Sequence, residues 1–417
     1  MCKMLVKYLL VYGAAFLGIF TAVFFLLTLF ENRKKLKNPK PLPELPGVSV
    51  VIPAYNEEKS LEKTVKSVQS LDYPAELVEI IIVDDGSKDS TLKIAKKLRM
   101  EDSRIKVFTK QNGGRASAKN HGIKHAKFPL IATLDSDSFI EKDALRKMIG
   151  YFGDSKVASV TAALKVHNPK SYWQRIQHIE YLFSIFLRKV FAFINAIHVT
   201  PGPFSLYRKK FFDRHGLFDE TKLAEDTEIA LRIQRHNYRI ENSIDAVVET
   251  VSPRKFSELL RQRIRWYYGL IQSLQSHPQL FMPKYGYVAL FALPAAIISV
   301  LVILVLVIYF TKLNLLILLD TVRNWHLIGF DFLNLVKGFK LSYLYYELTS
   351  PISFFLLISV LLNLLLVFIA KVKSGEKRSI KLSYCYYFAA YCYLYSIWWI
   401  AAFIYMLFGK LSWTEFK

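Results

Sequence analysis

Cysteine is scarce in this sequence of 417 residues, which contains only Cys2, Cys385 and Cys392. None of them forms a C-x-x-C pair, and this excludes the usual thiol-based metal and redox sites. The first lies at the amino terminus and the other two lie inside a long apolar run, so residues 3–384 contain no thiol. We therefore expect the polar middle of the chain to be a thiol-free domain in the cytoplasm.

Two glycine-rich signatures of phosphate binding are absent as well. The chain contains neither G-x-x-x-x-G-K-[ST] nor G-x-G-x-x-G. The sequence therefore gives little reason to expect a P-loop nucleotide hydrolase or a dinucleotide-binding enzyme.

Acidic residues are few relative to basic ones, 34 against 56, which gives a net charge of +22. Such a charge is typical of nucleic-acid binding, but the sequence has none of the usual nucleic-acid motifs. The basic residues are scattered through the middle of the chain and concentrated beside the apolar runs. Membrane lipids and an anionic substrate are therefore the expected partners, and nucleic acid is not.

Long apolar runs without charge are abundant. They cover residues 8–30, 285–310, 351–370 and 384–409. Each run reaches the roughly 20 residues that a helix needs to cross about 30 Å of hydrocarbon. The first run exceeds the ~7–15 apolar residues of a secretory signal, and no small-x-small cleavage site follows it, so we interpret it as an anchor. The sequence therefore predicts four transmembrane helices.

Basic segments predict how these helices are oriented. Segments 31–40 and 371–381 are rich in Lys and Arg, and such loops face the cytoplasm. The expected topology has both chain ends outside, residues 31–284 inside and residues 311–350 outside, in the plasma membrane. The predicted units are an N-terminal membrane helix (1–30), a basic, proline-rich linker (31–47), an α/β domain (48–255), interfacial helices (256–284) and a C-terminal membrane region (285–417).

The middle region alternates between two patterns. Segments 48–53 and 78–85 are short, apolar and rich in β-branched residues, and the intervening segment 57–71 has helical spacing. This is the strand–helix–strand pattern of a buried parallel sheet. It continues with a helix at 90–100, a strand at 104–110, a loop and helix at 113–126 and a strand at 130–135.

Polar clusters follow three of the predicted strands: "AYNEE" (54–58), "DDGSKDS" (84–90) and "DSDS" (135–138). Open α/β sheets bind ligands beyond the carboxyl ends of their strands, so three clusters at those ends indicate one site. Asp135 and Asp137 can point to the same side of an extended chain and suit a divalent cation that also binds substrate phosphates, although D-x-D also occurs in ordinary loops. The basic, glycine-rich "NGGRASAKNHG" suits phosphate binding or a turn into a helix.

Two further stretches have both structural and chemical interpretations. Glu225, Asp226 and Glu228 begin an amphipathic helix, where acidic residues complement the helix dipole, but one of them could serve as a general base. In "RQRIRWYYG" (261–269), residues 262, 265 and 266 share one helical face, and Arg263 points about 100° away. This stretch suits either an interfacial anchor or a phosphate site.

Taken in order, "VVIPAYNEE", "VDDGSKDST", "NGGRASAKNHG", "DSDS", "AEDTE" and "QRIRW" resemble the membrane-bound inverting glycosyltransferases of family 2. That family includes the cellulose, chitin, hyaluronan and poly-N-acetylglucosamine synthases. The resemblance spans residues 48–270, and "KVHNPKSYWQRIQHIEYL" with "GPFSLYRKK" is most similar to the hyaluronan and chitin-oligosaccharide synthases. In the acidic triplet, Ala224 stands where the family usually has Thr.

The resemblance implies an α/β GT-A fold, a nucleotide-diphospho-sugar transferase domain with a Rossmann-like sheet, joined to transmembrane α-helices. It also assigns roles to individual residues. The donor contacts would be Ala54, Tyr55, Glu57, Asp85, Arg115, Asp135, Gln262, Arg263 and Arg265. Mg²⁺ or Mn²⁺ would bind Asp135 and Asp137, and Trp266 would contact the acceptor. Asp226 would be the general base, with Glu225 beside it in the catalytic pair.

Three functions follow as hypotheses. The first is a processive enzyme that extends a β-linked polysaccharide from a UDP-sugar, with UDP-N-acetylglucosamine expected before UDP-glucose. The second is a transferase that adds a single sugar to a polyprenyl-phosphate or another lipid acceptor. The third is a non-catalytic membrane scaffold that senses nucleotide sugars.

Overall fold

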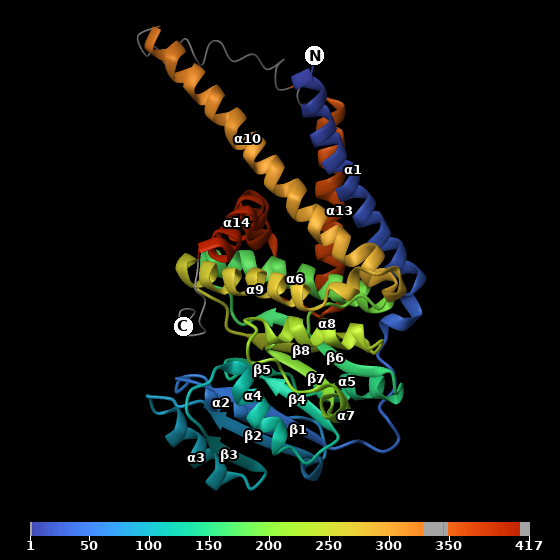
Figure 1. Ribbon diagram of the computed structural model, residues 1–417, viewed down its shortest axis with the longest axis vertical. Coiled ribbons are helices and arrows are strands. Elements are labelled where there is room, and N and C mark those ends of the chain that lie inside the picture. The colour runs from blue at the N-terminus through green and yellow to red at the C-terminus, as the bar shows by residue number, and fades with distance from the viewer. Residues whose placement is uncertain (1, 328–344, 346–348, 409–417) are drawn as a thin grey trace.

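The structure is a computed structural model that describes residues 2–327, 345 and 349–408 (Figure 1). It has three levels: a sheet with its helices at one end, a middle layer of helices α6 and α9, and helices α1, α10 and α13 that rise from this layer. Most of the second half of the predicted outer segment 311–350, and residue 409 of the last apolar run, lie outside the described residues.

An eight-stranded sheet organises the polar part of the chain, in the order β3-β2-β1-β4-β7-β6-β8-β5. Its strands are β1 (Val48–Ala54), β2 (Val78–Asp84), β3 (Ile105–Thr109), β4 (Leu130–Leu134), β5 (Ser138–Ile140), β6 (Val157–Val166), β7 (Phe204–Arg208) and β8 (Arg239–Thr250). The first four strands are parallel, and β7 runs antiparallel to both β4 and β6. β8 is parallel to β6, and β5 is antiparallel to β8 at the edge.

The predicted strands and helices of the first half are confirmed, because each apolar run is buried on two sides. Val50 and Ile52 of β1 belong to a core cluster on one face of the sheet, and Val51 belongs to a cluster on the other. Side chains alternate between faces, so a strand covered on both faces reads as a continuous apolar run. The covering helices are α2 (Leu61–Gln69), α3 (Thr91–Glu101), α4 (Arg115–Lys124), α5 (Ala144–Ile149), α7 (Lys209–His215) and α8 (Glu225–Arg235).

The reversal of direction at β7 brings the two halves of the sheet together at one edge. Leu134, the last residue of β4, pairs with Phe204, the first residue of β7. The backbone N–H of Asp135 donates to the carbonyl of Pro203 at 3.3 Å. The loop that precedes β7 therefore lies beside the predicted carboxylate pair.

Two long helices form the middle layer: α6 (Tyr172–Phe193) and α9 (Phe256–Ser276). A capping box starts α6, in which the Ser171 hydroxyl accepts from the Gln174 N–H at 3.2 Å and the Gln174 side chain accepts from the Ser171 N–H at 3.2 Å. Such a box satisfies two backbone donors that a helix start leaves unpaired. The helix predicted for "QRIRW" is confirmed as part of α9.

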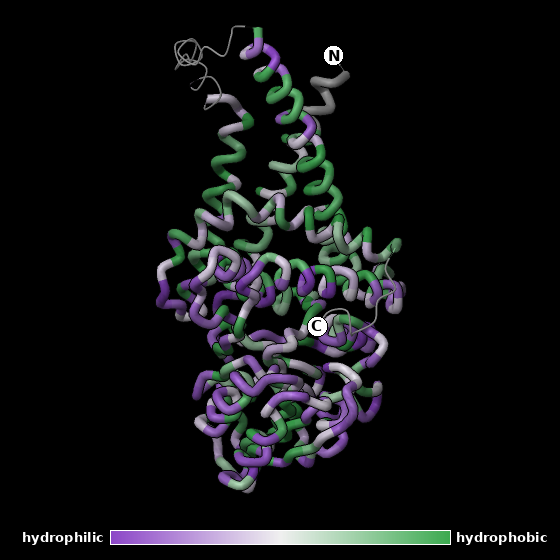
Figure 2. Tube along the Cα trace, turned by 90° about the vertical axis from the view of Figure 1, so that its left-hand side faces the viewer, coloured by the Kyte–Doolittle hydropathy of each residue, from purple (hydrophilic) through white to green (hydrophobic). Residues whose placement is uncertain are grey.

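Four helices among the described residues are long and apolar enough to cross a membrane, in agreement with the four predicted runs. They are α1 (Cys2–Glu31), α10 (Leu293–Leu327), α13 (Pro351–Lys373) and α14 (Lys381–Phe408). Figure 2 shows that hydrophobic residues dominate these helices and that hydrophilic residues cover the sheet domain. Short 3₁₀ turns occur at η1 (Arg33–Leu36), η2 (Ala75–Leu77), η3 (Gly150–Gly153), η4 (Pro278–Phe281) and η5 (Pro283–Tyr285), and a π turn occurs at η6 (Val288–Ala292).

Helix α14 differs from the other three because it lies directly over α9 and α6 (Figure 1). Tyr386 packs against Tyr172 of α6 with ring centroids 4.7 Å apart, and Trp399 stacks on Tyr267 of α9 at 4.6 Å. These contacts involve both halves of α14, so this helix is joined to the middle layer over much of its length. Its predicted crossing of the membrane stays a prediction.

Both basic segments contact the sheet domain. Asn38 donates to Asp245 at 2.6 Å, and the guanidinium of Arg378 donates to the carbonyl of Val166 at 2.8 Å and also binds Glu249. The two segments therefore lie on the same side of the apolar helices as the sheet, as the predicted topology requires.

Candidate active site

A cavity of about 550 Å³ lies where the sheet, the middle layer and the apolar helices meet. Helices α6 and α9 contribute its walls, and α10 and α14 line its far end. Seven residues predicted from the sequence line it: Arg115, Asp135, Asp137, Asp226, Gln262, Arg265 and Trp266. The structure thus brings four separate motifs to one place.

Asp135 and Asp137 form a pair of carboxylates at the sheet end of the cavity. One oxygen of Asp135, Oδ1, is buried without a hydrogen-bond partner in the part of the chain that the structure describes. Burial, and then the charges of Asp135 and Glu57, raise the pKa of Asp137 to about 7. Like charges crowded in a desolvated place favour either a proton or a bound cation. The pair is therefore suited to a metal ion.

The protein alone does not complete a metal cage here. Among the described residues, no group of three Asp, Glu, His or Cys side chains is arranged to hold a metal ion. A hard divalent ion such as Mg²⁺ often binds one or two carboxylates and takes its other ligands from water and substrate phosphates. The donor set of Asp135 and Asp137 fits an ion that binds together with a diphosphate.

Arg115 reaches the same carboxylates from the glycine-rich loop. The carboxylate of Asp85 accepts from the backbone N–H groups of Gly113 at 3.0 Å and Gly114 at 2.8 Å, and so fixes the loop before α4. Gly114 adopts a φ of 89°, a conformation that favours glycine. Arg115 then lies 3.3 Å from Asp135, whose charge raises the pKa of the guanidinium further.

Asp226 is the residue of the acidic triplet that reaches the cavity. Its Oδ2 accepts from the N–H of Gly202 at 3.3 Å, and its Oδ1 accepts from the N–H of Thr227 at 2.9 Å. Burial, and then the charge of Glu225, raise the pKa of Asp226 above its ordinary value. A carboxylate with a raised pKa in a cleft is a candidate general base.

Glu225 precedes Asp226 at the start of α8 and is almost fully buried. Its Oε1 lies 2.9 Å from Nζ of Lys119, and both side chains are only 1% exposed. Burial opposes ionisation of Glu225, but the charges of Lys119 and two arginines outweigh it and lower the pKa to about 2. Glu225 does not line the cavity. The geometry therefore favours an electrostatic effect on Asp226 over direct contact with a substrate.

Gly202 is a residue of the site that the sequence did not single out. It lines the cavity and donates its N–H to Asp226. A methyl group at this position would lie 3.3 Å from Oδ2 of Asp135 and 3.5 Å from a guanidinium nitrogen of Arg115. The residue lies within the quoted "GPFSLYRKK", but nothing in that stretch indicates contact with the acidic motifs.

Three residues of "QRIRW" face the cavity from α9, namely Gln262, Arg265 and Trp266. This agrees with their predicted common face. Burial, and then the nearby charge of Arg115, lower the pKa of Arg265, while the charges of Glu225, Asp226 and Asp135 act in the opposite direction.

Arg263 does not join them, and its predicted contact with the donor needs correction. Its guanidinium lies 2.7 Å from Glu180 of α6 and is only 1% exposed. The same group stacks over Trp266 at 4.1 Å and over Trp398 of α14 at 5.1 Å. One residue of helix turns a side chain by about 100°, which directs Arg263 away from the cavity face. Arg263 thus joins α9, α6 and α14 to one another.

The departure at Ala224 has a packing explanation. A methyl group at Gly269 of α9 would lie 2.5 Å from Cβ of Ala224, so the two backbones approach very closely at this point. A larger side chain at either position would press α9 away from the start of α8. Small residues at both positions keep Asp226 next to Arg265.

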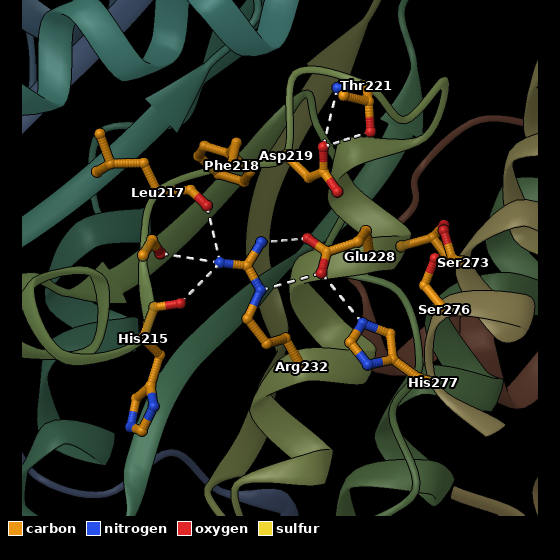
Figure 3. A network of polar contacts seen from close by, with 12 residues as sticks. His215, Leu217, Phe218, Asp219, Thr221, Glu228, Arg232, Ser273, Ser276 and His277 are labelled. Atoms are coloured by element: carbon orange, nitrogen blue, oxygen red, sulfur yellow. Dashed lines mark hydrogen bonds and ion pairs between the residues drawn. The ribbon is translucent and has the colours of Figure 1, made fainter. Parts of the chain in front are cut away.

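Glu228, the third acidic residue at the start of α8, belongs to a network of polar contacts that holds the fold together (Figure 3). It accepts from the guanidinium of Arg232, with Nε at 3.0 Å, and lies 3.1 Å from Nε2 of His277. Arg232 also donates to the carbonyls of His215, Gly216 and Leu217 at 2.8–3.0 Å. This network fixes α8 to the loop after α7 and to the end of α9, which holds Asp226 in position.

The four remaining predicted donor contacts do not line the cavity. Ala54, Tyr55, Glu57 and Asp85 lie at or just beyond the ends of β1 and β2, where the carbonyl of Ala54 accepts from the N–H of Asp85 at 2.8 Å. Glu57 interacts electrostatically with Asp135 and Arg115, so this group adjoins the cavity. Their contacts with a uridine stay predictions.

Comparison with known proteins relates part of the chain to a known family. Residues 49–216 match the family described as Glycosyl transferase family 2. The poly-β-1,6-N-acetyl-D-glucosamine synthase of Staphylococcus aureus (strain COL) is 32% identical over 237 residues, which cover 56% of this chain and 57% of that protein. The corresponding synthase of Staphylococcus epidermidis is 32% identical over 228 residues, or 54% and 55% of the two chains. The chain thus matches about half the length of these curated relatives.

A solved structure shows the same fold over nearly the whole chain. It is a mannosyltransferase from Pyrobaculum calidifontis in complex with GDP-Man and Mn²⁺, and it aligns with a TM-score of 0.57 over 96% of this chain and 99% of its own, at 19% identity. At that identity the likeness concerns the fold alone. Residues 49–216 are therefore similar to family 2 glycosyltransferases, and the fold of the sheet domain is of the GT-A type.

Proposed function

We propose that this protein is a membrane-embedded inverting glycosyltransferase that moves a sugar from a UDP-sugar to an acceptor hydroxyl. One observation carries the proposal: Asp226 faces the same cavity as the Asp135–Asp137 pair and the cations Arg115 and Arg265. The carboxylate pair and the two arginines suit a diphosphate, and Asp226 suits the proton of an attacking hydroxyl.

The donor would bind at the sheet end of the cavity. Asp135 and Asp137 would hold Mg²⁺ or Mn²⁺, and that ion would offset the negative charge of the diphosphate. Arg115 and Arg265 would bind the phosphate oxygens through their planar guanidinium groups. The Pyrobaculum mannosyltransferase was solved with GDP-Man and Mn²⁺, which supports a nucleotide sugar and a divalent ion as the pair to test.

The transfer would occur in one displacement. Asp226 takes the proton of the acceptor hydroxyl, the hydroxyl oxygen bonds to the anomeric carbon, and the bond from that carbon to the nucleoside diphosphate breaks. Attack from the side opposite the leaving group inverts the configuration at that carbon. The negative charge of Glu225 next to Asp226 favours the protonated form of the base, so it stabilises the state after proton transfer.

The acceptor is a growing β-linked glycan in the first hypothesis and a lipid in the second. The named activity of the staphylococcal relatives supports the glycan, with UDP-N-acetylglucosamine as first donor and UDP-glucose as second. The apolar far end of the cavity, where Ile297, Val300 and Phe403 lie, supports a lipid. A non-catalytic scaffold is disfavoured because Asp135, Asp137 and Asp226 are all present and share one cavity.

Placement in the plasma membrane, with the sheet domain in the cytoplasm, is part of the proposal. The four apolar helices support it, as do the two basic segments on the side of the sheet.

A panel of radiolabelled donors tests this function. The full-length protein in detergent would be incubated with UDP-N-acetylglucosamine, UDP-glucose and GDP-mannose, and the products would be sized. We expect the most transfer from UDP-N-acetylglucosamine, none in excess chelator, and recovery on addition of Mg²⁺ or Mn²⁺. Full transfer in chelator would contradict the metal site. Binding of UDP without transfer would favour the scaffold, and no binding of any donor would contradict a transferase.

A further inference from the structure

The segment between α13 and α14, residues 374–380, carries two charged side chains that contact other parts of the fold. The carboxylate of Glu376 is only 3% exposed, and its Oε2 lies 3.7 Å from Nζ of Lys165 in β6 and 3.8 Å from Nε2 of His178 in α6. Burial alone would raise the pKa of Glu376, but the contact with His178, the N–H of Arg378 and the charge of Lys165 outweigh it and lower the pKa to about 2. Glu376 is therefore a buried carboxylate that joins this segment to two other elements.

Arg378 connects the same segment to the ends of two neighbouring strands. Its guanidinium donates to the carbonyl of Val166, the last residue of β6, at 2.8 Å, and it also binds the carboxylate of Glu249 in β8. In the register of these strands Glu249 pairs with Lys165, and the next residue, Thr250, pairs with Val166. Arg378 therefore stabilises the pairing of β6 and β8 at this end of the sheet.

The residue after Glu249 belongs to the candidate active site. Thr250 lines the cavity, and its hydroxyl donates to Oδ1 of Asp137 at 3.4 Å. The backbone N–H of Val251 donates to the carbonyl of Asp137 at 3.3 Å. Successive side chains of a strand point to opposite faces, so Glu249 can contact Arg378 while Thr250 faces the cavity. A displacement of β8 at Glu249 would therefore move the groups that hold Asp137.

The contacts of segment 374–380 also involve the apolar helices. The segment joins the end of α13 to the start of α14, and both helices are long and apolar enough to cross a membrane. Nδ1 of His178, the residue that contacts Glu376, lies 3.4 Å from Oγ of Ser383 in the first turn of α14. One set of contacts therefore links the position of these helices to the position of β8.

We propose that Arg378 and Glu376 are positioning residues for Asp137. They hold the end of β8 in the place where Thr250 orients the Asp137 carboxylate for a divalent cation, and they couple the packing of α13 and α14 to the metal site. Groups that orient a metal ligand typically change metal affinity by about 10- to 100-fold, and a residue that acts through such a group should change it less. The inference rests on the metal site of the proposed function.

Binding of Mn²⁺ tests this role without a measurement of turnover. The full-length protein in detergent would be titrated with Mn²⁺ in saturating UDP and followed by EPR, with UDP alone as the blank. Arg378→Gln should weaken Mn²⁺ binding roughly 2- to 30-fold, as substitutions within a coupled network do. UDP binding measured in chelator should stay unchanged, because Arg378 does not line the cavity. Lys377→Gln, at the exposed neighbouring position, makes the same change of charge and should bind Mn²⁺ as the wild type does.

A double-mutant cycle separates this role from a general effect on stability. Thr250→Val keeps the shape of the side chain and removes the hydroxyl that contacts Asp137, so it should weaken Mn²⁺ binding by itself. If Arg378 acts through Thr250, the loss in the double variant should be smaller than the two single losses combined. Additive losses would overturn the proposal, as would wild-type affinity for Mn²⁺ in Arg378→Gln, whatever its melting temperature. Should Arg378→Gln not fold, Arg378→Lys takes its place in the cycle and should show a smaller loss that is again not additive.

Failure of the proposed function would give a different result. If the wild-type protein binds UDP but no Mn²⁺, the metal site is wrong and the positioning role is overturned with it. If the wild type binds Mn²⁺ and the Arg378 variants bind it equally well, only the positioning role is wrong.

Discussion

Two parts of the cavity wall differ in how their charges are balanced. Where the sheet meets α4 and α8, Arg115 lies 3.3 Å from Asp135, and Lys119 lies 2.9 Å from Glu225. On α6, Arg188 also lines the cavity, but it forms no salt bridge with a carboxylate of the described residues, and its Nε has no hydrogen-bond partner. Paired charges fix the geometry of a site before its ligands bind. The proposed transfer therefore relies on the paired groups.

Removal of the base should give the largest effect at the sheet end. Asp226→Asn keeps the shape but cannot accept the proton, so we expect kcat to fall about 10²- to 10⁴-fold, the range that a positioned base contributes. Donor binding should change little. Asp143→Asn, an exposed carboxylate at the start of α5, is the control and should transfer normally. Normal turnover of Asp226→Asn together with loss in Glu225→Gln would make Glu225 the base instead.

Breaking the buried pair beneath the base should destabilise the protein. Lys119→Met leaves Glu225 charged and buried, which typically costs about 3–5 kcal/mol in the free energy of unfolding. Lys66→Met, which removes a similar charge from the exposed pair with Glu62, should leave the free energy of unfolding almost unchanged, because water screens such a pair. Thermal or denaturant unfolding of the two variants measures the difference. Equal losses would mean that the burial of Lys119 and Glu225 has no energetic consequence.

The two arginines of "QRIRW" should separate function from stability. Arg265→Lys keeps the charge but loses the planar fork, so we expect turnover to fall roughly 10- to 100-fold, as for the loss of a charge-assisted hydrogen bond. Arg263→Lys should leave donor affinity unchanged and lower the melting temperature, because it weakens the contact with Glu180 and two tryptophans. The reverse pattern would return Arg263 to the donor site.

The pH dependence should show the smallest but most specific effect. Asp226 acts as a base only when ionised, so turnover should fall as the pH falls through its pKa. That pKa is raised by burial and by Glu225 above the ordinary value of about 3.9. Lys119 lowers it, so Lys119→Met should move the acid limb of the kcat profile to higher pH. An acid limb that stays in place would show that Lys119 does not act on the base.

Much of the fold followed from the sequence because its strongest patterns are local. Strands β1 and β2 are buried on both faces and appear as continuous apolar runs. The four long apolar helices need only length and the absence of charge. The order of the second half of the sheet was not predictable, because β7 lies between β4 and β6 through pairing of residues about 70 positions apart, as between Leu134 and Phe204.

Only part of the site could be predicted from the sequence, because contacts between residues far apart in the chain leave no local pattern. Asp135, Asp137, Asp226 and Arg265 belong to quoted motifs, and the structure brings them to one cavity. The roles of Lys119 and Gly202 depend on partners far away in the chain, such as Glu225 for Lys119. Helical spacing predicted that the side chain of Arg263 points away from those of Gln262, Arg265 and Trp266. It did not predict that Arg263 would form an ion pair with Glu180 and stack over Trp398. Arg188 belongs to none of the quoted motifs, and it was identified only because it lines the cavity.

The stereochemistry of the first bond formed tests the proposed transfer most directly. The wild-type protein would be incubated with an α-linked UDP-sugar, and the product would be analysed by NMR for the configuration at the transferred anomeric carbon. Deprotonation of the acceptor by a single base, Asp226, predicts one displacement and therefore a β-linked product. An α-linked product would require two displacements or attack from the side of the leaving group, and it would contradict the assignment of the cavity.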